Sequence, residues 1–470
     1  MATKIRFGTD GWRAIIAEDF TFENVKRAAN ALAVYINSKS KASKKVVIGY
    51  DTRFQSQTFA KLAAEELSAC GVDVVVNKSF LSTPAVSSAV VDLKCDAGIV
   101  ISASHNPPEF NGFKIKYEKG CSAPAEMTSE IERIIDQPSV PHASIAAKLQ
   151  TMDLTDDYFK RLKAFIDFSL LKKSNIKIVA DPMHGASCGY METLLKGSKI
   201  NLTCIHNQPD PVFGGLHPEP IESELSDLKR AVKLNCADAG LATDGDGDRI
   251  GVVDERGRYY PPHQVFPLLL HYMAKYRKEK GKVVQTISLG YISERMAKDN
   301  DLEWEEVPVG FKYIADRIIK EKVLIGGEES GGYGFGGFLP ERDGILNSLM
   351  IAEMLCSIKK PLSKILDEIQ KLYGTSVFLR TDFKKSPRAL WTKAEFVSTL
   401  KAKSPDKIAG LKVTNIKDYD GIEFVLEDDS WILLRPSGTE PIIRVYSESP
   451  NLERTKKIIN WGNTFVSSLV

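Results

Sequence analysis

The sequence lacks the features of membrane-spanning, secreted and nucleic-acid-binding proteins. No apolar run approaches the roughly 20 residues that a membrane span needs, and residues 1–6 lack the apolar core of a signal peptide. The 63 basic and 61 acidic residues leave a net charge of +2, which argues against nucleic-acid or membrane partners. We therefore expect a cytoplasmic protein that recognises any anionic ligand through a local cluster of residues.

Cysteine pairs at metal-binding or redox spacing are also absent. The seven cysteines lie scattered at positions 70, 95, 121, 188, 204, 236 and 356, and no C-x-x-C occurs. An odd number at such spacing predicts neither a disulfide framework nor a structural zinc site.

The chain is too long for one hydrophobic core, because single cores rarely exceed roughly 250–300 residues. Three stretches of its 470 residues repeat one plan, in which strand and helix patterns alternate and end in a polar loop. This plan predicts α/β sheets covered on both faces, with ligands at the carboxyl ends of strands. After residue 372 the pattern predicts a small α+β domain. The expected domains are 1–150, 151–256, 257–372 and 373–470.

Regular apolar patterns between polar ends predict individual elements within this plan. Strands are expected over residues 45–50 and 97–101, and helices over 56–69, 153–168, 261–274, 292–299 and 452–467.

The first polar loop follows an apolar strand and reads S-A-S-H-N-P-P-E-F-N-G-F-K over residues 102–114. The two prolines stiffen it, and Asn-Gly at 111–112 predicts a turn that carries Lys114 back toward Ser104. A serine hydroxyl beside His105 and a lysine suits a phosphoryl-accepting nucleophile. For this stretch alone, a loop whose serine only caps backbone groups is an equally good interpretation.

The second loop carries three carboxylates, Asp244, Asp246 and Asp248, at alternate positions. Such carboxylates repel one another unless a cation is present. They fit positions one, three and five of a calcium EF-hand, with Glu255 at position twelve. However, position six is Arg249 where that loop needs glycine, and the flanking residues have strand patterns rather than helical ones. Mg²⁺ bridging a phosphate is therefore the better prediction.

Three further loops are rich in glycine and polar residues: F-G-T-D-G-W-R ending at Arg13, G-G-E-E-S-G-G at 326–332 and R-P-S-G-T-E-P at 435–441. Arg13 can contact a phosphate, although for this loop alone a tight turn with a surface arginine is the better interpretation. The last loop has the donors of a compact anion-binding nest, and Arg444 adds a second guanidinium, which favours the nest over a simple hairpin-like turn.

Together and in this order, S-A-S-H-N-P with N-G-F-K, D-G-D-G-D-R, G-E-E-S-G and R-P-S-G-T-E-P resemble the α-D-phosphohexomutase family, the phosphoglucomutases and phosphomannomutases. The resemblance extends from Phe7 to Arg444. It implies three similar α/β domains with mixed sheets around a cleft, plus a smaller C-terminal α+β domain. It also implies an enzyme that interconverts hexose 1-phosphate and hexose 6-phosphate through a hexose 1,6-bisphosphate.

The resemblance further implies a role for each matching residue. The residues expected to ligate Mg²⁺ are Ser104, which would carry the phosphoryl group, and Asp244, Asp246 and Asp248. The residues expected around the transferring group are Arg13, His105, Lys114 and Arg249, with Lys114 a candidate for proton transfer. The residues expected to bind substrate are Glu328 and Ser330 at the sugar hydroxyls, Gly310 and Lys312 near the sugar, and Arg435, Ser437, Gly438 and Thr439 at the non-reacting phosphate.

Two details bear on the sugar. Gly332 stands where related bacterial enzymes often carry a histidine, and the segment 310–312 resembles the G-W-K of α-phosphoglucomutases. We therefore expect glucose to be the preferred sugar, with mannose or glucosamine as alternatives. The expected partners are small hexose phosphates, and the expected state is a monomer or homodimer.

Two interpretations from other classes stay open. A serine hydrolase would need Ser104 activated by a histidine, but His105 is its sequence neighbour and is expected to point elsewhere, and no G-x-S-x-G elbow occurs. A non-enzymatic Ca²⁺-binding protein would keep the aspartates but has no use for the loop at 435–439.

Overall fold

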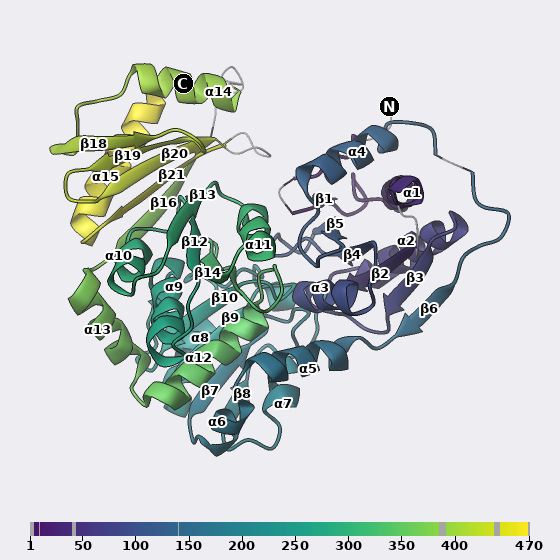
Figure 1. The fold of residues 1–470 in the computed structure, drawn as a ribbon, viewed down its shortest axis with the longest axis horizontal. Coiled ribbons are helices and arrows are strands. Elements are labelled where there is room, and N and C mark those ends of the chain that lie inside the picture. The colour runs from purple at the N-terminus through teal and green to yellow at the C-terminus, as the bar shows by residue number, and fades with distance from the viewer. Residues whose placement is uncertain are drawn as a thin grey trace.

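The computed structural model describes residues 4–8, 10–39, 44–139, 141–384, 392–436 and 442–468. Four sheets follow one another along the chain and define four units. In Figure 1 the first unit lies at the right, the second at the bottom, the third at the left and the fourth at the upper left. The first three units are α/β, and the fourth is an antiparallel sheet with helices. The predicted fold class is therefore confirmed.

The first unit is built on a mixed six-stranded sheet. Its elements are β1 (Trp12–Ile15), α1 (Phe22–Lys39), β2 (Lys45–Tyr50), α2 (Ser56–Ala69), β3 (Asp73–Asn77), α3 (Thr83–Asp92), β4 (Ala97–Ile101), β5 (Phe110–Tyr117), α4 (Ala125–Ile135) and β6 (Leu149–Met152). The strand order is β1-β5-β4-β2-β3-β6, and β4, β2, β3 and β6 run parallel. Successive residues of β2 point to opposite faces: Val46 packs with α1 and α2, and Val47 with α3.

The second unit repeats this plan with five strands in the order β11-β10-β9-β7-β8. Its elements are α5 (Thr155–Phe165), α6 (Phe168–Lys173), β7 (Lys177–Asp181), α7 (Tyr190–Leu195), β8 (Asn201–Cys204), the 3₁₀ turn η1 (Phe213–Gly215), α8 (Ser226–Asn235), β9 (Ala239–Thr243), β10 (Ile250–Asp254) and β11 (Tyr259–Tyr260). Strands β8, β7 and β9 are parallel, whereas β10 and β11 are antiparallel to their neighbours.

The third unit has four strands in the order β13-β12-β14-β15. Its elements are α9 (Pro262–His271), the π turn η2 (Tyr272–Tyr276), β12 (Lys282–Thr286), α10 (Ile292–Asp299), β13 (Trp304–Val307), α11 (Phe311–Lys320), β14 (Val323–Gly327), β15 (Tyr333–Phe335), α12 (Gly344–Ile358) and α13 (Leu362–Tyr373). Helix α12 is apolar on nearly all sides and buried from Gly344 to Cys356, as expected for a helix inside a protein. It packs against β9, β10 and α6 of the second unit as well as β15, so these two units share a core.

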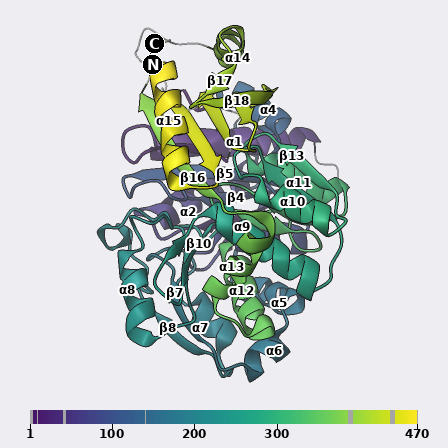
Figure 2. The ribbon, with the colours of Figure 1, turned by 90° about the vertical axis from the view of Figure 1, so that its left-hand side faces the viewer.

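The fourth unit is an antiparallel sheet in the order β16-β21-β20-β19-β18-β17. Its elements are β16 (Val377–Lys384), α14 (Lys393–Ala402), β17 (Lys407–Ile408), β18 (Leu411–Lys417), β19 (Ile422–Leu426), β20 (Trp431–Pro436), β21 (Ile442–Ser449) and α15 (Leu452–Ser467). Helix α15 covers one face of this sheet, as the turned view in Figure 2 shows. On the opposite face, Phe378 stacks on His263 of α9 with ring centroids 3.8 Å apart.

Each of the three α/β sheets carries one parallel strand that is followed directly by an antiparallel partner. These pairs are β4–β5, β9–β10 and β14–β15. The loops at their turns hold Ser104, the three aspartates and Glu328. The repeated pairing therefore presents three polar loops at the carboxyl ends of three strands, which is where α/β proteins bind ligands.

The turn predicted at Asn111–Gly112 is wrong. Both residues lie inside β5, where Asn111 pairs with Ala14 and Gly112 pairs with Arg13 of β1. A Cβ atom on Gly112 would lie 2.4 Å from the carbonyl oxygen of Ser102. Glycine is needed here because two backbones approach closely, a reason that a sequence does not separate from turn formation.

The domain boundaries after 150, 256 and 372 stay predictions. The first falls inside β6, the second lies before β11, which extends the second sheet to Tyr260, and the third falls in the last turn of α13. Within the described part of the chain, no helix has the length and apolar character that crossing a membrane requires.

Candidate active site

The loops of the first two units meet at Ser104. Its hydroxyl donates a hydrogen bond to Asp244 Oδ2 over 2.9 Å and is buried. Ser104 has a φ of 53°, in the left-handed region that non-glycine residues rarely occupy. Its N–H donates to the Oγ of Ser102 over 2.9 Å. The surrounding loop therefore holds the serine in an unfavourable backbone conformation that aims its hydroxyl at the aspartates.

Arg53, just after β2, holds the Ser104 loop in this shape. Its guanidinium donates to four carbonyl oxygens, those of Ser104 and Asn106 at 2.6 Å, Pro107 at 2.7 Å and Phe110 at 3.1 Å. The Nε of Arg53 pairs with Asp51 over 3.0 Å, and both side chains are fully buried. A buried, rigid guanidinium with all three nitrogens engaged fixes a loop more firmly than turn residues alone.

The three aspartates form an oxygen cage with open acceptors. Their ligand atoms lie within 4.8 Å of one another, and all three side chains are fully buried. Asp246 Oδ1 and Asp248 Oδ1 are buried and have no hydrogen-bond partner. Burial and the charges of its two neighbours raise the pKa of Asp244 well above its ordinary value. Buried carboxylate oxygens without donors fit a hard divalent cation such as Mg²⁺.

Lys114 provides positive charge beside this cage. Its Nζ lies 2.6 Å from Asp246 Oδ2, 2.8 Å from Asp10 Oδ2 and 3.7 Å from Asp248 Oδ2. Burial alone would lower the pKa of Lys114, but these carboxylates outweigh it and raise that pKa above its ordinary value. Lys114 therefore stays protonated, which suits charge neutralisation and disfavours a proton-accepting role.

Arg342 joins the first three units. One guanidinium nitrogen, Nη2, lies 2.7 Å from Asp248 Oδ2 and 2.9 Å from Asp10 Oδ2, and Nη1 lies 3.3 Å from Glu328 Oε2. A Cβ atom at Gly332 would lie 2.3 Å from Arg342 Cδ. Gly332 thus makes room for the stem of Arg342.

His105 and Arg249 come from two different units, and both lie within 4.0 Å of Glu219 Oε1. Arg249 Nη1 pairs with Glu219 Oε1 over 2.9 Å, and its N–H donates to Asp244 Oδ1 over 3.0 Å. His105 Nδ1 lies 3.4 Å from Ser104 Oγ, so the expectation that this ring points elsewhere is wrong. Burial and the positive charges of Arg249 and Arg13 lower the pKa of His105 well below its usual range. The imidazole is therefore neutral at physiological pH.

Arg13 lies at the edge of the same group. Its Nη1 donates to Asn106 Oδ1 over 2.8 Å, and its Nη2 lies 3.6 Å from Asp10 Oδ2. Its side chain keeps more solvent contact than Lys114 or Arg53. Arg13 is thus held in place on one side and open to an anionic ligand on the other.

The predicted sugar loop reaches the site through Glu328. Burial raises the pKa of Glu328 to about 7, against the opposing charge of Arg342. The Oγ of Ser330 is buried and has no hydrogen-bond partner. A buried carboxyl group with a raised pKa and an unpaired hydroxyl are suited to hydrogen bonds with the hydroxyls of a sugar.

The fourth unit reaches the third through Asp420. This buried carboxylate accepts from Arg435 Nε over 3.0 Å and from the N–H of Val309 over 2.7 Å, and it also pairs with Lys393. Val309 directly precedes Gly310, the N-cap residue of α11. Arg435 is therefore anchored beside the 310–312 segment, whose Lys312 has its Nζ 5.1 Å from the ring centroid of Tyr313.

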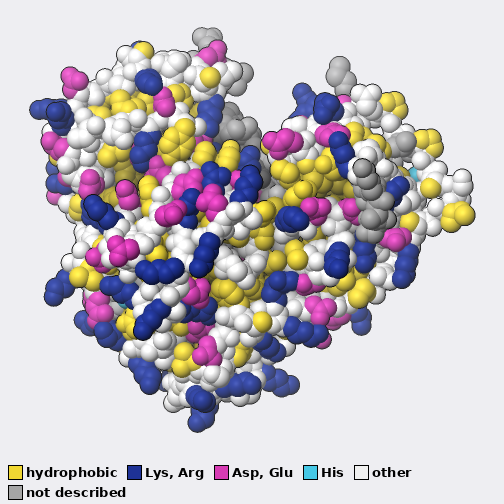
Figure 3. All heavy atoms as spheres, in the orientation of Figure 1, with side chains coloured by type: hydrophobic (Ala, Val, Ile, Leu, Met, Phe, Trp, Pro, Cys, Tyr) yellow, Lys and Arg dark blue, Asp and Glu magenta, His cyan; other side chains and the backbone are white. Residues whose placement is uncertain are grey.

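Three of the predicted phosphate ligands, Ser437, Gly438 and Thr439, lie outside the described residues. Strand β20 ends just before them, and β21 begins at Ile442, with Arg435 and Arg444 directly opposite in the two strands. In the space-filling view a notch opens between the fourth and the first unit, and charged side chains gather beside it (Figure 3).

Sequence reasoning missed four residues that organise this site: Asp10, Arg53, Arg342 and Asp420. Arg53 and Arg342 each stand in a polar segment next to the predicted loops, D-T-R after β2 and P-E-R-D-G before α12. Arg53 could therefore have been predicted as a site residue, because it is a charged residue in the short segment that follows a buried strand. Asp420 has no comparable signal, since its contact with Val309 joins residues more than 100 positions apart.

Sequence models of four domains of one family match this chain in order. They are the phosphoglucomutase/phosphomannomutase α/β/α domain I at residues 4–141, domain II at 156–257, domain III at 261–373 and the C-terminal domain at 398–460. Together the four matches cover most of the chain, and they include the loops that hold Ser104, the three aspartates, Glu328 and Arg435.

Individual relatives agree over nearly the full length. A protein from Thermococcus kodakarensis named phosphoglucomutase/phosphomannomutase is 30% identical over 458 residues, which are 97% of each chain. One from Methanosphaera stadtmanae named probable phosphoglucosamine mutase is 33% identical over 467 residues, 99% of this chain and 98% of its own. A solved structure from Thermus thermophilus, provisionally named a phosphomannomutase, has a TM-score of 0.87 at 32% identity and covers 99% of this chain and 100% of that one.

Proposed function

Because the chain belongs to the phosphoglucomutase/phosphomannomutase family, whose members are phosphohexomutases, we propose that Ser104 carries the phosphoryl group that this enzyme moves between O1 and O6 of a hexose. The observation that carries the proposal is the buried Ser104 hydroxyl, 2.9 Å from an aspartate cage with two unpartnered oxygens. The donor set supports a site for Mg²⁺ made of Asp244, Asp246, Asp248 and the phosphorylated Ser104. Mg²⁺ bound there would neutralise charge on the transferring group.

In the proposed first half-reaction, the bond between Ser104 Oγ and phosphorus breaks as a sugar hydroxyl oxygen bonds to phosphorus. Lys114, which pairs with Asp246, and Arg249, whose backbone N–H donates to Asp244, would offset the charge that develops on the departing oxygen, which is the main requirement of phosphoryl transfer. The sugar hydroxyl must lose its proton. His105 Nδ1 lies 3.4 Å from Ser104 Oγ and so is near the reacting oxygen, but its lowered pKa makes it a weak base for this step.

The product of that step is a hexose 1,6-bisphosphate, which must turn over so that its other phosphate reaches Ser104. During each half-reaction the phosphate that does not react needs a separate site. Arg435 on the fourth unit, with Ser437, Gly438 and Thr439, supplies that site in the proposal, and Glu328 and Ser330 hold sugar hydroxyls between the two phosphates. A phosphate site on a separate unit suits a substrate that must reorient.

The choice of sugar is the part of the sequence prediction that the relatives support least. Their names are phosphoglucomutase/phosphomannomutase, phosphoglucosamine mutase and phosphomannomutase. These names favour the alternatives, mannose and glucosamine, over a preference for glucose. We therefore propose a phosphohexomutase that acts on mannose 1-phosphate or glucosamine 1-phosphate at least as well as on glucose 1-phosphate. A cytoplasmic location and a monomeric or dimeric state stay predictions.

The test compares glucose 1-phosphate, mannose 1-phosphate and glucosamine 1-phosphate with the full-length protein, Mg²⁺ and a catalytic amount of the matching 1,6-bisphosphate. Formation of each 6-phosphate is followed, and kcat/KM values are compared. The proposal predicts the highest value for mannose or glucosamine, or equal values with glucose. A glucose preference above tenfold would overturn the sugar assignment alone, and no conversion of any of the three would overturn the proposed function.

A further inference from the structure

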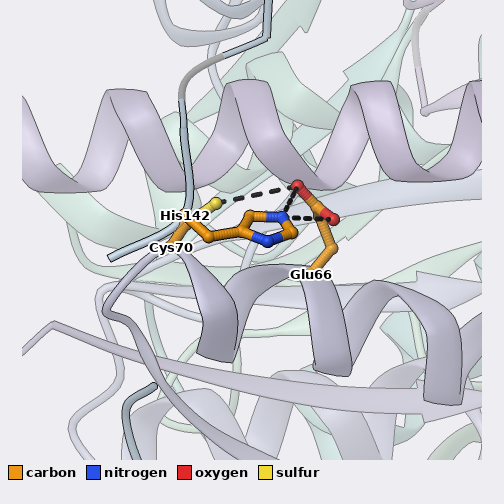
Figure 4. Close-up of side chains that lie close together, drawn as sticks. All are labelled: Glu66, Cys70 and His142. Atoms are coloured by element: carbon orange, nitrogen blue, oxygen red, sulfur yellow. Dashed lines mark hydrogen bonds and ion pairs between the residues drawn. The ribbon is translucent and has the colours of Figure 1, made fainter. Parts of the chain in front are cut away.

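A second cluster of metal-binding side chains lies in the first unit, outside the candidate active site. Glu66 is on α2, Cys70 directly follows the last residue of that helix, and His142 is on the segment 141–148 that leads into β6. Figure 4 shows the imidazole of His142 directed at the carboxylate of Glu66, with the sulfur of Cys70 on the same side. Glu66 and Cys70 are four residues apart, which places both side chains on one face of a helix.

All three ligand atoms lie within 4.8 Å of one another, and the two distances from Glu66 are those of a tetrahedral metal site. His142 Nε2 lies 3.3 Å from Glu66 Oε1, and Cys70 Sγ lies 3.7 Å from the same oxygen. Zinc bonds of about 2.0–2.3 Å at tetrahedral angles separate neighbouring ligand atoms by roughly 3.3–3.7 Å. The three side chains can therefore close around an ion with little movement.

Neighbouring groups hold these side chains in place. The amide of Asn30 on α1 donates to Glu66 Oε1 over 2.9 Å and to Cys70 Sγ over 3.3 Å. Backbone hydrogen bonds from Ala143 to Ala69 and from Ala147 to Ser68, at 2.8 and 2.9 Å, hold the segment that carries His142 against the end of α2. An amide that contacts two ligands is the kind of outer-shell partner that fixes metal ligands.

We propose that Glu66, Cys70 and His142 form a binding site for Zn²⁺, with a water molecule as the fourth ligand. One carboxylate, one imidazole and one thiolate suit a borderline-soft ion, whereas the all-oxygen aspartate cage suits a hard one. The ion would tie residues 141–148 to α2.

Binding of the ion must displace one proton. An ordinary cysteine thiol, with a pKa of roughly 8.5, is mostly protonated at neutral pH when no ion is bound. When a sulfur–zinc bond forms, this proton passes to solvent, and two negative ligands then balance the charge of the ion. Affinity should therefore rise with pH.

The cysteine spacing in the sequence did not predict this site. Metal-binding motifs place ligands a few residues apart, but His142 stands 72 positions after Cys70, and the three residues meet only through the packing of 141–148 on α2.

The test uses Co²⁺ as a probe on the full-length protein. Cobalt bound to a thiolate gives a charge-transfer absorption band in the near ultraviolet, which oxygen ligands such as those of the aspartate cage do not give. The proposal predicts such a band at one equivalent of Co²⁺ and its loss when Zn²⁺ is added. It also predicts that Cys70→Ala abolishes the band and that Cys236→Ala, a change at an exposed cysteine elsewhere, leaves it unchanged.

Two further variants keep the test decisive if Cys70→Ala fails to fold. The side chain of His142 is 59% exposed, so His142→Ala leaves the core intact and should weaken Co²⁺ binding by more than tenfold. Asn30→Ala, which removes only the outer-shell amide, should weaken it roughly 10–100-fold. Absence of the band in the wild-type protein, or a band of equal strength in His142→Ala, would show that the cluster is only hydrogen-bonded and would overturn the proposal.

Discussion

The candidate active site and the contact between the third and fourth units use buried charge in different ways. Around Ser104, Lys114 contacts three carboxylates and Arg342 contacts four, and Asp10 and Asp248 are shared between these two cations. Where the fourth unit meets the third, Arg435 makes one ion pair among the described residues, and it joins the Nε of Arg435 to Asp420. The first arrangement fixes geometry from three sides, whereas in the second the described contact holds the guanidinium through its Nε.

This difference fits the two tasks in the proposed reaction. Chemistry at Ser104 requires reacting atoms to be held within a fraction of an ångström, and interlocked ion pairs provide that. The distal phosphate must be bound and released in each cycle while the sugar turns over. A cation with one anchoring partner meets that need. Each variant below changes one of these two regions and leaves the other intact.

The largest effect is expected from Asp246→Asn. This change removes a carboxylate charge that faces both the proposed Mg²⁺ and Lys114, and loss of a Lewis acid costs several kcal/mol of transition-state stabilisation, or roughly two to three orders of magnitude in kcat. Initial rates across a Mg²⁺ titration measure it. Asp367→Asn, at an exposed position on α13, is the matched control and should be neutral. Wild-type rates for Asp246→Asn in the presence of EDTA would exclude a metal role for this carboxylate.

Arg435→Ala should affect only reactions in which a second phosphate is held. A bidentate, charge-assisted contact contributes about 1.5–3 kcal/mol, so transfer from phospho-Ser104 to a hexose 1-phosphate should slow by roughly one to two orders of magnitude. Transfer to the unphosphorylated hexose should change little. Single-turnover decay of labelled phosphoenzyme with each acceptor measures both. Equal losses with the two acceptors would instead assign Arg435 a role in the fold.

Gly332→Ala should loosen the active-site network through Arg342. The added Cβ would lie 2.3 Å from Arg342 Cδ, so the guanidinium must shift away from its carboxylate partners. Overpacking of this kind costs about 1–3 kcal/mol of stability. The free energy of unfolding, measured by chemical denaturation, and kcat should both decrease. Gly337→Ala is the control: Gly337 has open space around it but a positive φ, so this change should lower stability without lowering kcat. An unchanged kcat in Gly332→Ala would show that Arg342 does not organise the site.

Glu448→Gln is expected to have the smallest effect, one that depends on pH. Burial raises the pKa of Glu448 to about 7, from an ordinary value of 4.5. The folded state therefore holds its proton more tightly than the unfolded state, and the group reduces stability as pH rises from about 4.5 through 7. The uncharged glutamine should raise the free energy of unfolding by about 1–3 kcal/mol at pH 8 and change it little at pH 4.5. Denaturation at the two pH values measures it, and equal differences at both would contradict it.

The sequence predicted the elements with strong patterns most accurately. Strands β2 and β4 and helices α2, α10 and α15 begin and end at the predicted residues, since each is a regular apolar pattern between polar ends. The helix predicted over 153–168 is interrupted, because α5 ends at Phe165 and α6 begins at Phe168. The helix predicted over 261–274 changes to a π turn after His271. Periodicity does not locate such local breaks.

For the site, the motifs predicted which loops meet but not what holds them. Ser104 and the aspartates were found because their chemistry is visible in a short stretch. Arg53, Arg342 and Asp420 were not, because each acts through contacts with residues 50 to more than 300 positions away. Their roles follow from packing between units, which local patterns do not encode.

The most direct test of the account is the fate of a labelled phosphoryl group on Ser104. The protein is incubated with Mg²⁺ and a hexose 1,6-bisphosphate labelled with ³²P, separated from the sugar, and mapped by peptide mass spectrometry. It is then mixed with unlabelled hexose 1-phosphate in a single turnover. The account predicts label on Ser104 and its transfer to the sugar bisphosphate at a rate at least equal to kcat. Label on another residue, or turnover by a protein that never carries phosphate on Ser104, would contradict it.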